Sequence, residues 1–64
     1  MEIYVLILSD GTVSGIYSTK DKLIADLTTV FAPCKIKSVE VWDVDKGFVE
    51  YLNIHKTTTV TIED

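Results

Sequence analysis

The sequence predicts an α+β fold, a mostly antiparallel sheet of four or five strands in the order ββαββ(β), with one helix packed on one face. Three observations lead to this prediction. An Asp10-Gly11 dipeptide separates two β-rich segments, one segment of helical periodicity follows, and further β-rich segments come after it. Because the chain has only 64 residues, we expect a single domain, residues 1–64.

The first hairpin is predicted from residues 3–17. Residues 3–9 are apolar at nearly every position, which is typical of a central strand covered on both faces. Asp10-Gly11 fits a two-residue type I′ turn, because both central positions need a positive φ that Asp tolerates and Gly adopts freely. A second strand near residues 12–17 then pairs with the first.

The type I′ turn determines which side chains of the two strands face each other. The predicted pairs are Leu8 with Val13, Ile7 with Ser14, Val5 with Ile16 and Tyr4 with Tyr17. Gly15 then lies opposite Leu6 and leaves a gap that a larger neighbour can fill.

A helix is predicted at about residues 19–31. The tetrapeptide from Ser18 to Asp21 has the form of a capping box, so that Ser18 or Thr19 caps the first turn. The apolar stripe consists of Leu23, Leu27, Val30 and Phe31, with Ile24 at its edge. Pro33 ends the helix. A single helix with one such stripe can cover only one face of the sheet.

Two further strands are predicted at residues 35–45 and 48–54. We expect Lys46-Gly47 to join them as a two-residue turn, and the alternative is a three-residue loop that ends in a Gly47 bulge. The two-residue turn would place Trp42, Val44, Val49 and Tyr51 on one face, and Val39, Val41, Leu52 and Ile54 on the other. Residues 57–64 alternate β-branched side chains and are predicted to form an extra strand.

Charge and composition exclude several classes of protein. The net charge is -4, and all six basic residues are lysines, whereas nucleic-acid readers use Arg-rich basic patches. The longest apolar run, residues 3–8, is far shorter than the roughly 18 residues of a membrane helix, and no basic segment precedes it as in a signal peptide. We therefore expect a soluble, cytoplasmic protein that binds neither nucleic acid nor membrane.

The sequence also argues against an enzyme or a cofactor-binding protein. Cys34 and His55 are the only cysteine and the only histidine, so the chain has no internal disulfide and no zinc-ligand set. Catalysis by Cys34 would need a base and an orienting group. Residues 43–47, DVDKG, resemble the start of a calcium loop, but the Gly comes one position early. We expect no catalytic, metal or cofactor-binding residues, and we expect self-association as a homodimer to stabilise so short a chain.

Two segments carry a resemblance to a protein family. They are IYVLILSDGTVSGIYSTKDKLIADL at residues 3–27 and VEVWDVD at residues 39–45. The chain resembles a group of small uncharacterised bacterial and phage ββαββ proteins with an opening YVL strand, a GxVxGxYSxxxK segment and an ExWxVD strand. The matching positions are Tyr4, Val5, Leu6, Gly11, Val13, Gly15, Tyr17, Ser18, Lys22, Glu40, Trp42, Val44 and Asp45. The resemblance implies a small accessory protein carried by a phage or another mobile element.

The sheet face away from the helix is the candidate functional surface. Its apolar side chains would remain exposed, and contiguous apolar patches on soluble proteins are usually interaction sites. The predicted partner or dimer interface consists of Trp42, Val44, Val49, Tyr51, Tyr4 and Tyr17, with the strand at residues 57–62 extending it at an edge. The alternative is that the Trp42 face packs under the helix and that Val39, Val41, Leu52 and Ile54 are exposed instead. We expect a non-enzymatic protein-interaction module that modulates, and given the resemblance inhibits, a host protein. The alternative is a homo-oligomer that sequesters a small molecule or nucleotide, which the absence of Arg disfavours.

Overall fold

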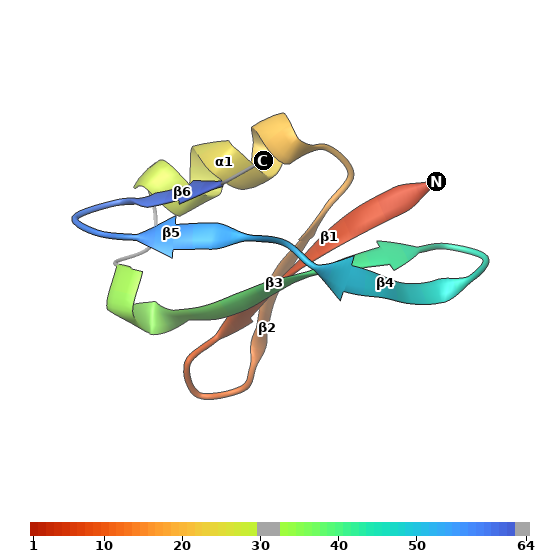
Figure 1. Ribbon diagram of the computed structural model, residues 1–64, viewed down its shortest axis with the longest axis horizontal. Coiled ribbons are helices and arrows are strands. Elements are labelled where there is room, and N and C mark those ends of the chain that lie inside the picture. The colour runs from red at the N-terminus through yellow and green to blue at the C-terminus, as the bar shows by residue number, and fades with distance from the viewer. Residues whose placement is uncertain (30–32, 63–64) are drawn as a thin grey trace.

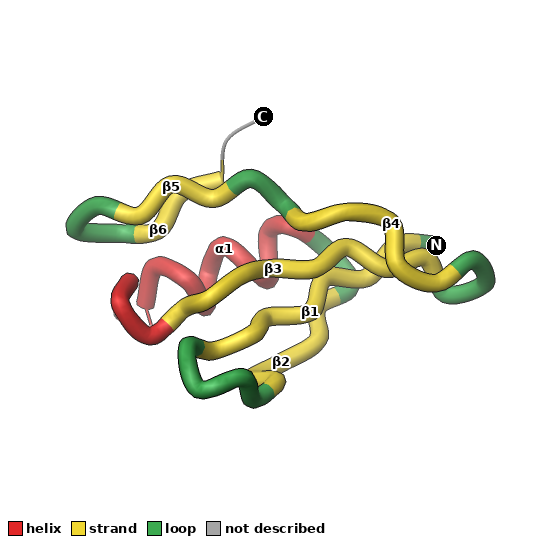
Figure 2. The backbone as a smooth tube through the Cα atoms, turned by 60° about the horizontal axis from the view of Figure 1, so that its bottom comes forward, coloured by secondary structure: helices red, strands yellow, loops and turns green. Residues whose placement is uncertain are grey.

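The computed structural model describes residues 1–29 and 33–62 and confirms the predicted α+β fold (Figure 1). The elements are β1 (Glu2–Leu8), β2 (Val13–Tyr17), α1 (Lys20–Thr29), the 3-10 helix η1 (Pro33–Lys35), β3 (Ile36–Asp43), β4 (Gly47–Tyr51), β5 (Ile54–Lys56) and β6 (Val60–Ile62). Strands β2-β1-β3-β4 form an antiparallel sheet in that order, and β5 and β6 form a second, two-stranded sheet. The first strand is therefore central, as its apolar sequence predicts, but the prediction that both of its faces are covered is wrong for the described residues, because α1 and the β5–β6 pair lie on one side of the sheet (Figure 2).

The first turn differs from the predicted type I′ turn. Gly11 has a φ of +89°, but no non-glycine residue among those described has a positive φ, so Asp10 does not adopt the type I′ conformation. Instead Gly11 N–H donates to the Leu8 carbonyl and Leu8 N–H to the Thr12 carbonyl, both at 2.9 Å. The Asp10 carboxylate accepts hydrogen bonds from the Thr12 hydroxyl (2.6 Å) and N–H (2.9 Å), which lower the pKa of Asp10. Only the glycine then needs the left-handed conformation.

Most of the predicted register nevertheless holds. Tyr4 pairs with Tyr17, Val5 with Ile16, and Leu6 with Gly15, as predicted. The register shifts between Leu6 and Ile7, so that Ile7 pairs with Val13 and not with Ser14. The first turn is thus one residue longer than predicted. The irregularity on β2 compensates for this residue and restores the predicted pairing farther from the turn.

Helix α1 is capped by Thr19 and not by Ser18. The Thr19 hydroxyl accepts a hydrogen bond from Lys22 N–H at 3.3 Å, which is the contact of an N-cap residue with the third residue of the helix. Leu23 and Leu27 of the predicted stripe are buried, whereas Ile24 at its edge is exposed. The predictions for Val30 and Phe31 lie outside the described residues.

The prediction of a two-residue turn at Lys46-Gly47 is wrong, because the turn that forms is longer. Residues 44–46 form the turn and Gly47 follows with a φ of +89°, an arrangement nearer to the alternative loop that ends at Gly47. The Asp43 carboxylate accepts hydrogen bonds from the N–H groups of Asp45 (2.8 Å) and Lys46 (3.0 Å). These bonds, that from Asp45 first, lower the pKa of Asp43. The carboxylate therefore favours the longer loop, because it satisfies backbone donors that the turn leaves unpaired.

The new turn changes the pairing between β3 and β4. Tyr51 pairs with Glu40, two positions from the predicted partner Trp42, and Trp42 pairs with Phe48. A shift of two residues keeps Tyr51 on the Trp42 face, since side chains alternate with period two. The register shifts between Val41 and Trp42, which leaves Val49 as the extra residue of β4.

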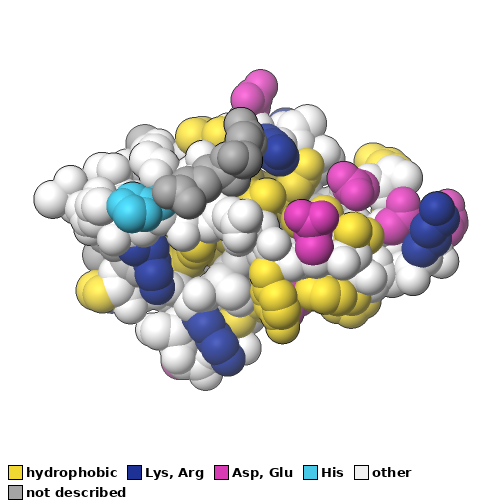
Figure 3. Space-filling view, in the orientation of Figure 1, with side chains coloured by type: hydrophobic (Ala, Val, Ile, Leu, Met, Phe, Trp, Pro, Cys, Tyr) yellow, Lys and Arg dark blue, Asp and Glu magenta, His cyan; other side chains and the backbone are white. Residues whose placement is uncertain are grey.

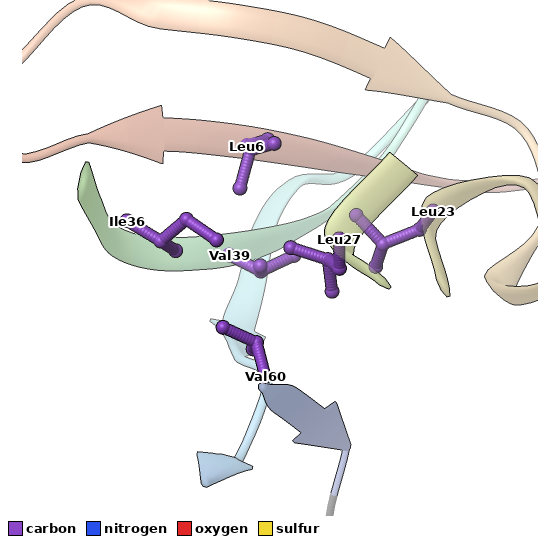
Figure 4. Close-up of a cluster of buried hydrophobic side chains, with 6 residues drawn as sticks. All are labelled: Leu6, Leu23, Leu27, Ile36, Val39 and Val60. Atoms are coloured by element: carbon purple, nitrogen blue, oxygen red, sulfur yellow. The ribbon is translucent and has the colours of Figure 1, made fainter. Parts of the chain in front are cut away.

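The core lies on one side of the four-stranded sheet, under α1 and the β5–β6 pair. Figure 2 shows both on the same side of strands β1 to β3. The buried cluster consists of Leu6, Leu23, Leu27, Ile36, Val39 and Val60 (Figure 4). Val60 brings β6 into this cluster, so the predicted tail strand covers the core beside the helix. The expectation that it extends the opposite face is wrong.

Candidate functional site

The sheet face opposite α1 has no covering layer among the described residues, and we call it the open face. Backbone pairing and side-chain alternation place ten residues of four strands on it. They are Ile3, Val5 and Ile7 of β1, Val13 and Ile16 of β2, Ser38, Glu40 and Trp42 of β3, and Phe48 and Tyr51 of β4. Eight of the ten are apolar or aromatic, so the open face is a hydrophobic surface.

One row of the open face runs across the whole sheet. Ile16 pairs with Val5, Val5 with Glu40, and Glu40 with Tyr51. Glu40 therefore lies on an inner strand, in the middle of the open face.

Much of the open face is accessible. The exposed fractions are 64% for Ile16, 61% for Tyr51, 57% for Val13 and 45% for Phe48. On the opposite side of the same sheet, Leu6 and Val39 are fully buried. In the space-filling view, hydrophobic side chains gather over and below β4 (Figure 3). One face of the sheet therefore makes the core, and the other meets solvent with large apolar side chains.

The β4 side of the open face carries three aromatic rings. The Trp42 and Phe48 ring centroids are 5.6 Å apart with a 79° interplanar angle, and those of Phe48 and Tyr51 are 5.1 Å apart at 62°. Both are edge-to-face contacts, the geometry that aromatic quadrupoles favour. Trp42 Nε1–H donates a hydrogen bond of 2.9 Å to Glu40 Oε1. The indole and the carboxylate are thus oriented by each other.

Two residues of the predicted interface, Tyr4 and Tyr17, lie on the helix side of the sheet. Both pack against the buried cluster. The Tyr17 hydroxyl donates a hydrogen bond of 2.6 Å to the Asp26 carboxylate of α1. Partial burial first, and this bond to a negative charge second, raise the pKa of Tyr17 to about 12. Tyr17 thus attaches the helix to the sheet, and neither tyrosine belongs to the open face.

The other predicted interface residues divide into two pairs. Trp42 and Tyr51 lie on the open face, whereas Val44 is exposed in the turn and Val49 is exposed at the irregularity of β4. Phe48 lies opposite Trp42, the place predicted for Tyr51, and joins the face on which Val49 was predicted, because the longer turn shifts the pairing there by an odd number of residues. The signal that could have identified Phe48 is Asp43, whose side chain favours the longer turn.

The residues considered for chemistry occupy ordinary structural positions. Cys34 is exposed in η1, His55 is exposed on β5, and the Asp43 carboxylate binds the backbone of its own turn. Within residues 1–29 and 33–62 no three His, Cys, Asp or Glu side chains come together as a metal site.

A shallow pocket lies on the helix side of the sheet. It has a volume of ≈ 100 Å³ and is lined by Glu2, Tyr4, Lys20, Val41, Glu50 and Leu52. Sites for small molecules usually have about 300 to 1,000 Å³. The two glutamates would also repel a phosphate group. This pocket therefore does not favour the nucleotide-binding alternative.

Comparison of the chain with protein-family models, with curated proteins and with solved structures finds no match. Within residues 1–29 and 33–62, the structure contains no helix that could span a lipid bilayer. The open face is therefore the feature of the molecule that bears on its function.

Proposed function

We propose that the protein is a non-enzymatic interaction module that binds another protein through the open face. The observation that carries the proposal is an apolar face that runs across all four strands of the sheet, with exposed large side chains on both outer strands, such as Ile16 on β2 and Tyr51 on β4. Apolar side chains that pack against neither a helix nor a second sheet lose favourable burial energy, so a partner surface that covers them stabilises the complex.

The size of the patch supports this proposal. With about 200 Å² for each large side chain, the exposed fractions of Val13, Ile16, Phe48 and Tyr51 amount to roughly 450 Å². That is about a tenth of the total surface of 4209 Å², and about half of the roughly 800 Å² that one partner contributes to a standard interface. The surrounding polar rim would supply the rest.

The composition of the face also suits recognition. Trp and Tyr are enriched among residues whose truncation weakens interfaces, and Trp42 and Tyr51 flank Phe48 in one aromatic cluster. The resemblance of the sequence to small bacterial and phage proteins suggests a bacterial protein as the target. We propose inhibition as the outcome, because a small chain that covers part of another protein's surface most simply blocks what that surface binds.

Site-specific photo-crosslinking in bacterial cells tests the proposal. A benzophenone amino acid replaces Ile16 or Tyr51 on the open face, and the control carries it at Lys22, an exposed position of α1. We expect the same second protein to be crosslinked from both open-face positions and not from Lys22. The purified partner should then bind Ile16→Glu at least about tenfold more weakly than the wild type.

Three results would contradict parts of this proposal. Equal crosslinking from Lys22 and the open face would show that the face is not selective, and no crosslinks from either open-face position would refute the interaction. Crosslinks only to a second copy of the chain would instead support the predicted homodimer, which analytical ultracentrifugation can verify.

A further inference from the structure

We infer that the partner inserts a lysine or arginine side chain, flanked by apolar residues, against the Glu40 carboxylate of the open face. This inference rests on the proposed function, because it names the chemistry that the same face recognises. Glu40 is the one charged residue among the ten that define the face.

Glu40 has no cationic partner in the described part of the chain. Its side chain is half-buried, and the hydrogen bond that it accepts there comes from the neutral Trp42 indole. The ion pair found among residues 1–29 and 33–62 joins the Met1 amino group to Asp43, at the end of the sheet. Among the described residues no cation balances the Glu40 carboxylate, so water is left to stabilise its charge.

Covering the open face would remove this water. A carboxylate transferred from water to an apolar contact without a counter-charge loses its solvation, and this loss opposes binding. An entirely apolar partner would bear the full loss, whereas a Lys or Arg placed on Glu40 replaces the water by a charge-assisted hydrogen bond. The middle position of Glu40 means that a partner cannot cover the face and leave this carboxylate at the wet rim.

The neighbours of Glu40 also suit a cation. Tyr51 lies directly opposite it on β4, and Trp42 is hydrogen-bonded to it on the same strand. Aromatic rings attract ammonium and guanidinium groups, and Trp does so most strongly. A cationic head group on Glu40 would therefore meet a carboxylate and aromatic rings together.

A second copy of the chain suits the open face less well. A two-fold axis through the middle of the face would bring two Glu40 carboxylates toward each other, each in an apolar contact. The net charge of -4 adds long-range repulsion between copies, whereas it attracts a basic partner. Charge complementarity thus favours a partner of different sequence.

Two short peptides test this inference directly. Acetyl-Leu-Arg-Leu-amide supplies a guanidinium between apolar side chains, and acetyl-Leu-citrulline-Leu-amide has the same shape without the charge. Trp42 is the only tryptophan, so its fluorescence and its indole N–H signal in NMR report binding at this site. We expect the Arg peptide to bind the wild type at least about fivefold more tightly than the citrulline peptide.

Matched variants separate the Glu40 charge from the general acidity of the chain. Glu40→Gln keeps an oxygen acceptor for Trp42 Nε1–H but removes the charge, and it should abolish the preference for the Arg peptide. Glu50→Gln makes the same charge change on β4, where Glu50 pairs with Val41 and lines the pocket on the helix side. It should keep the preference.

The outcomes distinguish this inference from the proposed function. Equal binding of both peptides, or a preference that survives Glu40→Gln, would overturn the inference and leave an apolar interaction face. No response of Trp42 to either peptide up to about 10 mM would also overturn it, while the crosslinking experiment decides the proposed function separately. A stable wild-type dimer that buries Trp42 would make a second copy the occupant and refute the basic partner.

Discussion

Gly15→Ala should loosen the attachment of α1 to the sheet, because Gly15 lies beneath the Tyr17 ring. A Cβ added at Gly15 would lie 2.8 Å from Tyr17 Oη and 3.1 Å from Cζ, too close for either atom to stay in place. The gap opposite Leu6 that the sequence predicts is therefore filled by this ring. Moving the ring withdraws the hydroxyl from Asp26, to which it now donates at 2.6 Å.

Two effects of opposite sign determine the magnitude. A hydrogen bond to a charged acceptor contributes about 1.5 to 3 kcal/mol, and we expect roughly 1 to 2 kcal/mol of this to be lost because Asp26 is partly exposed and regains water. Gly15 has no positive φ, so alanine fits its backbone and reduces the entropy of the unfolded chain by about 0.4 to 1 kcal/mol. The net destabilisation is about 1 kcal/mol, or a fall in Tm of about 4 to 8 °C for a domain of this size.

Thermal unfolding and an alkaline titration measure the two parts of the prediction. The pKa of Tyr17 is raised from 10.0 to about 12, so the folded state retains a proton that the unfolded state releases. The stabilisation is therefore complete below pH 10 and is lost as the pH rises from about 10 to 12. Gly15→Ala should return this pKa toward its usual value and remove the extra loss of stability.

Tyr17→Phe is the matched control, because it deletes the hydroxyl and keeps the ring. The difference in absorbance at alkaline pH between the wild type and Tyr17→Phe isolates the titration of Tyr17. A Gly15→Ala variant with an unchanged or higher Tm, and with the pKa of Tyr17 still about 12, would refute the reasoning.

The remaining predictions concern the first turn, the helix cap and the core. Gly11→Val should destabilise the protein by about 1 to 3 kcal/mol, because a β-branched residue is strained at a φ of +89°; an unchanged urea midpoint would contradict this. Thr19→Ala should cost about 0.5 to 2 kcal/mol, whereas Ser18→Ala should be nearly silent, since Thr19 provides the cap; a larger loss in Ser18→Ala would reverse the assignment. Leu23→Ala, at a side chain with 0% exposure, should cost about 2 to 5 kcal/mol, while Ile24→Ala, at 40% exposure in the same helix, should cost less than about 1 kcal/mol by chemical denaturation. Similar losses in the two variants would show that the helix buries another face.

Side-chain alternation explains how much of the open face could be predicted. Trp42 and Tyr51 share a face in both the predicted and the observed register, because the two registers differ by two residues at Tyr51. Phe48 lies on the Trp42 face in place of Val49, which becomes the extra residue of β4, because the pairing next to the turn shifts by an odd number of residues. The strands and their apolar faces are thus readable from local patterns, whereas residues beside a loop depend on the turn that forms.

Periodicity and apolar content are local properties of the chain, and they suffice to predict the α+β class, the order of the elements and the central place of β1. The strand that pairs with the tail, and the side of the sheet on which each tyrosine lies, depend instead on tertiary contacts. Val60 joins the core with Leu27, and Tyr17 binds Asp26, through contacts between segments distant in sequence. Competition among all apolar segments for one small core determines such contacts, and no local pattern contains the result.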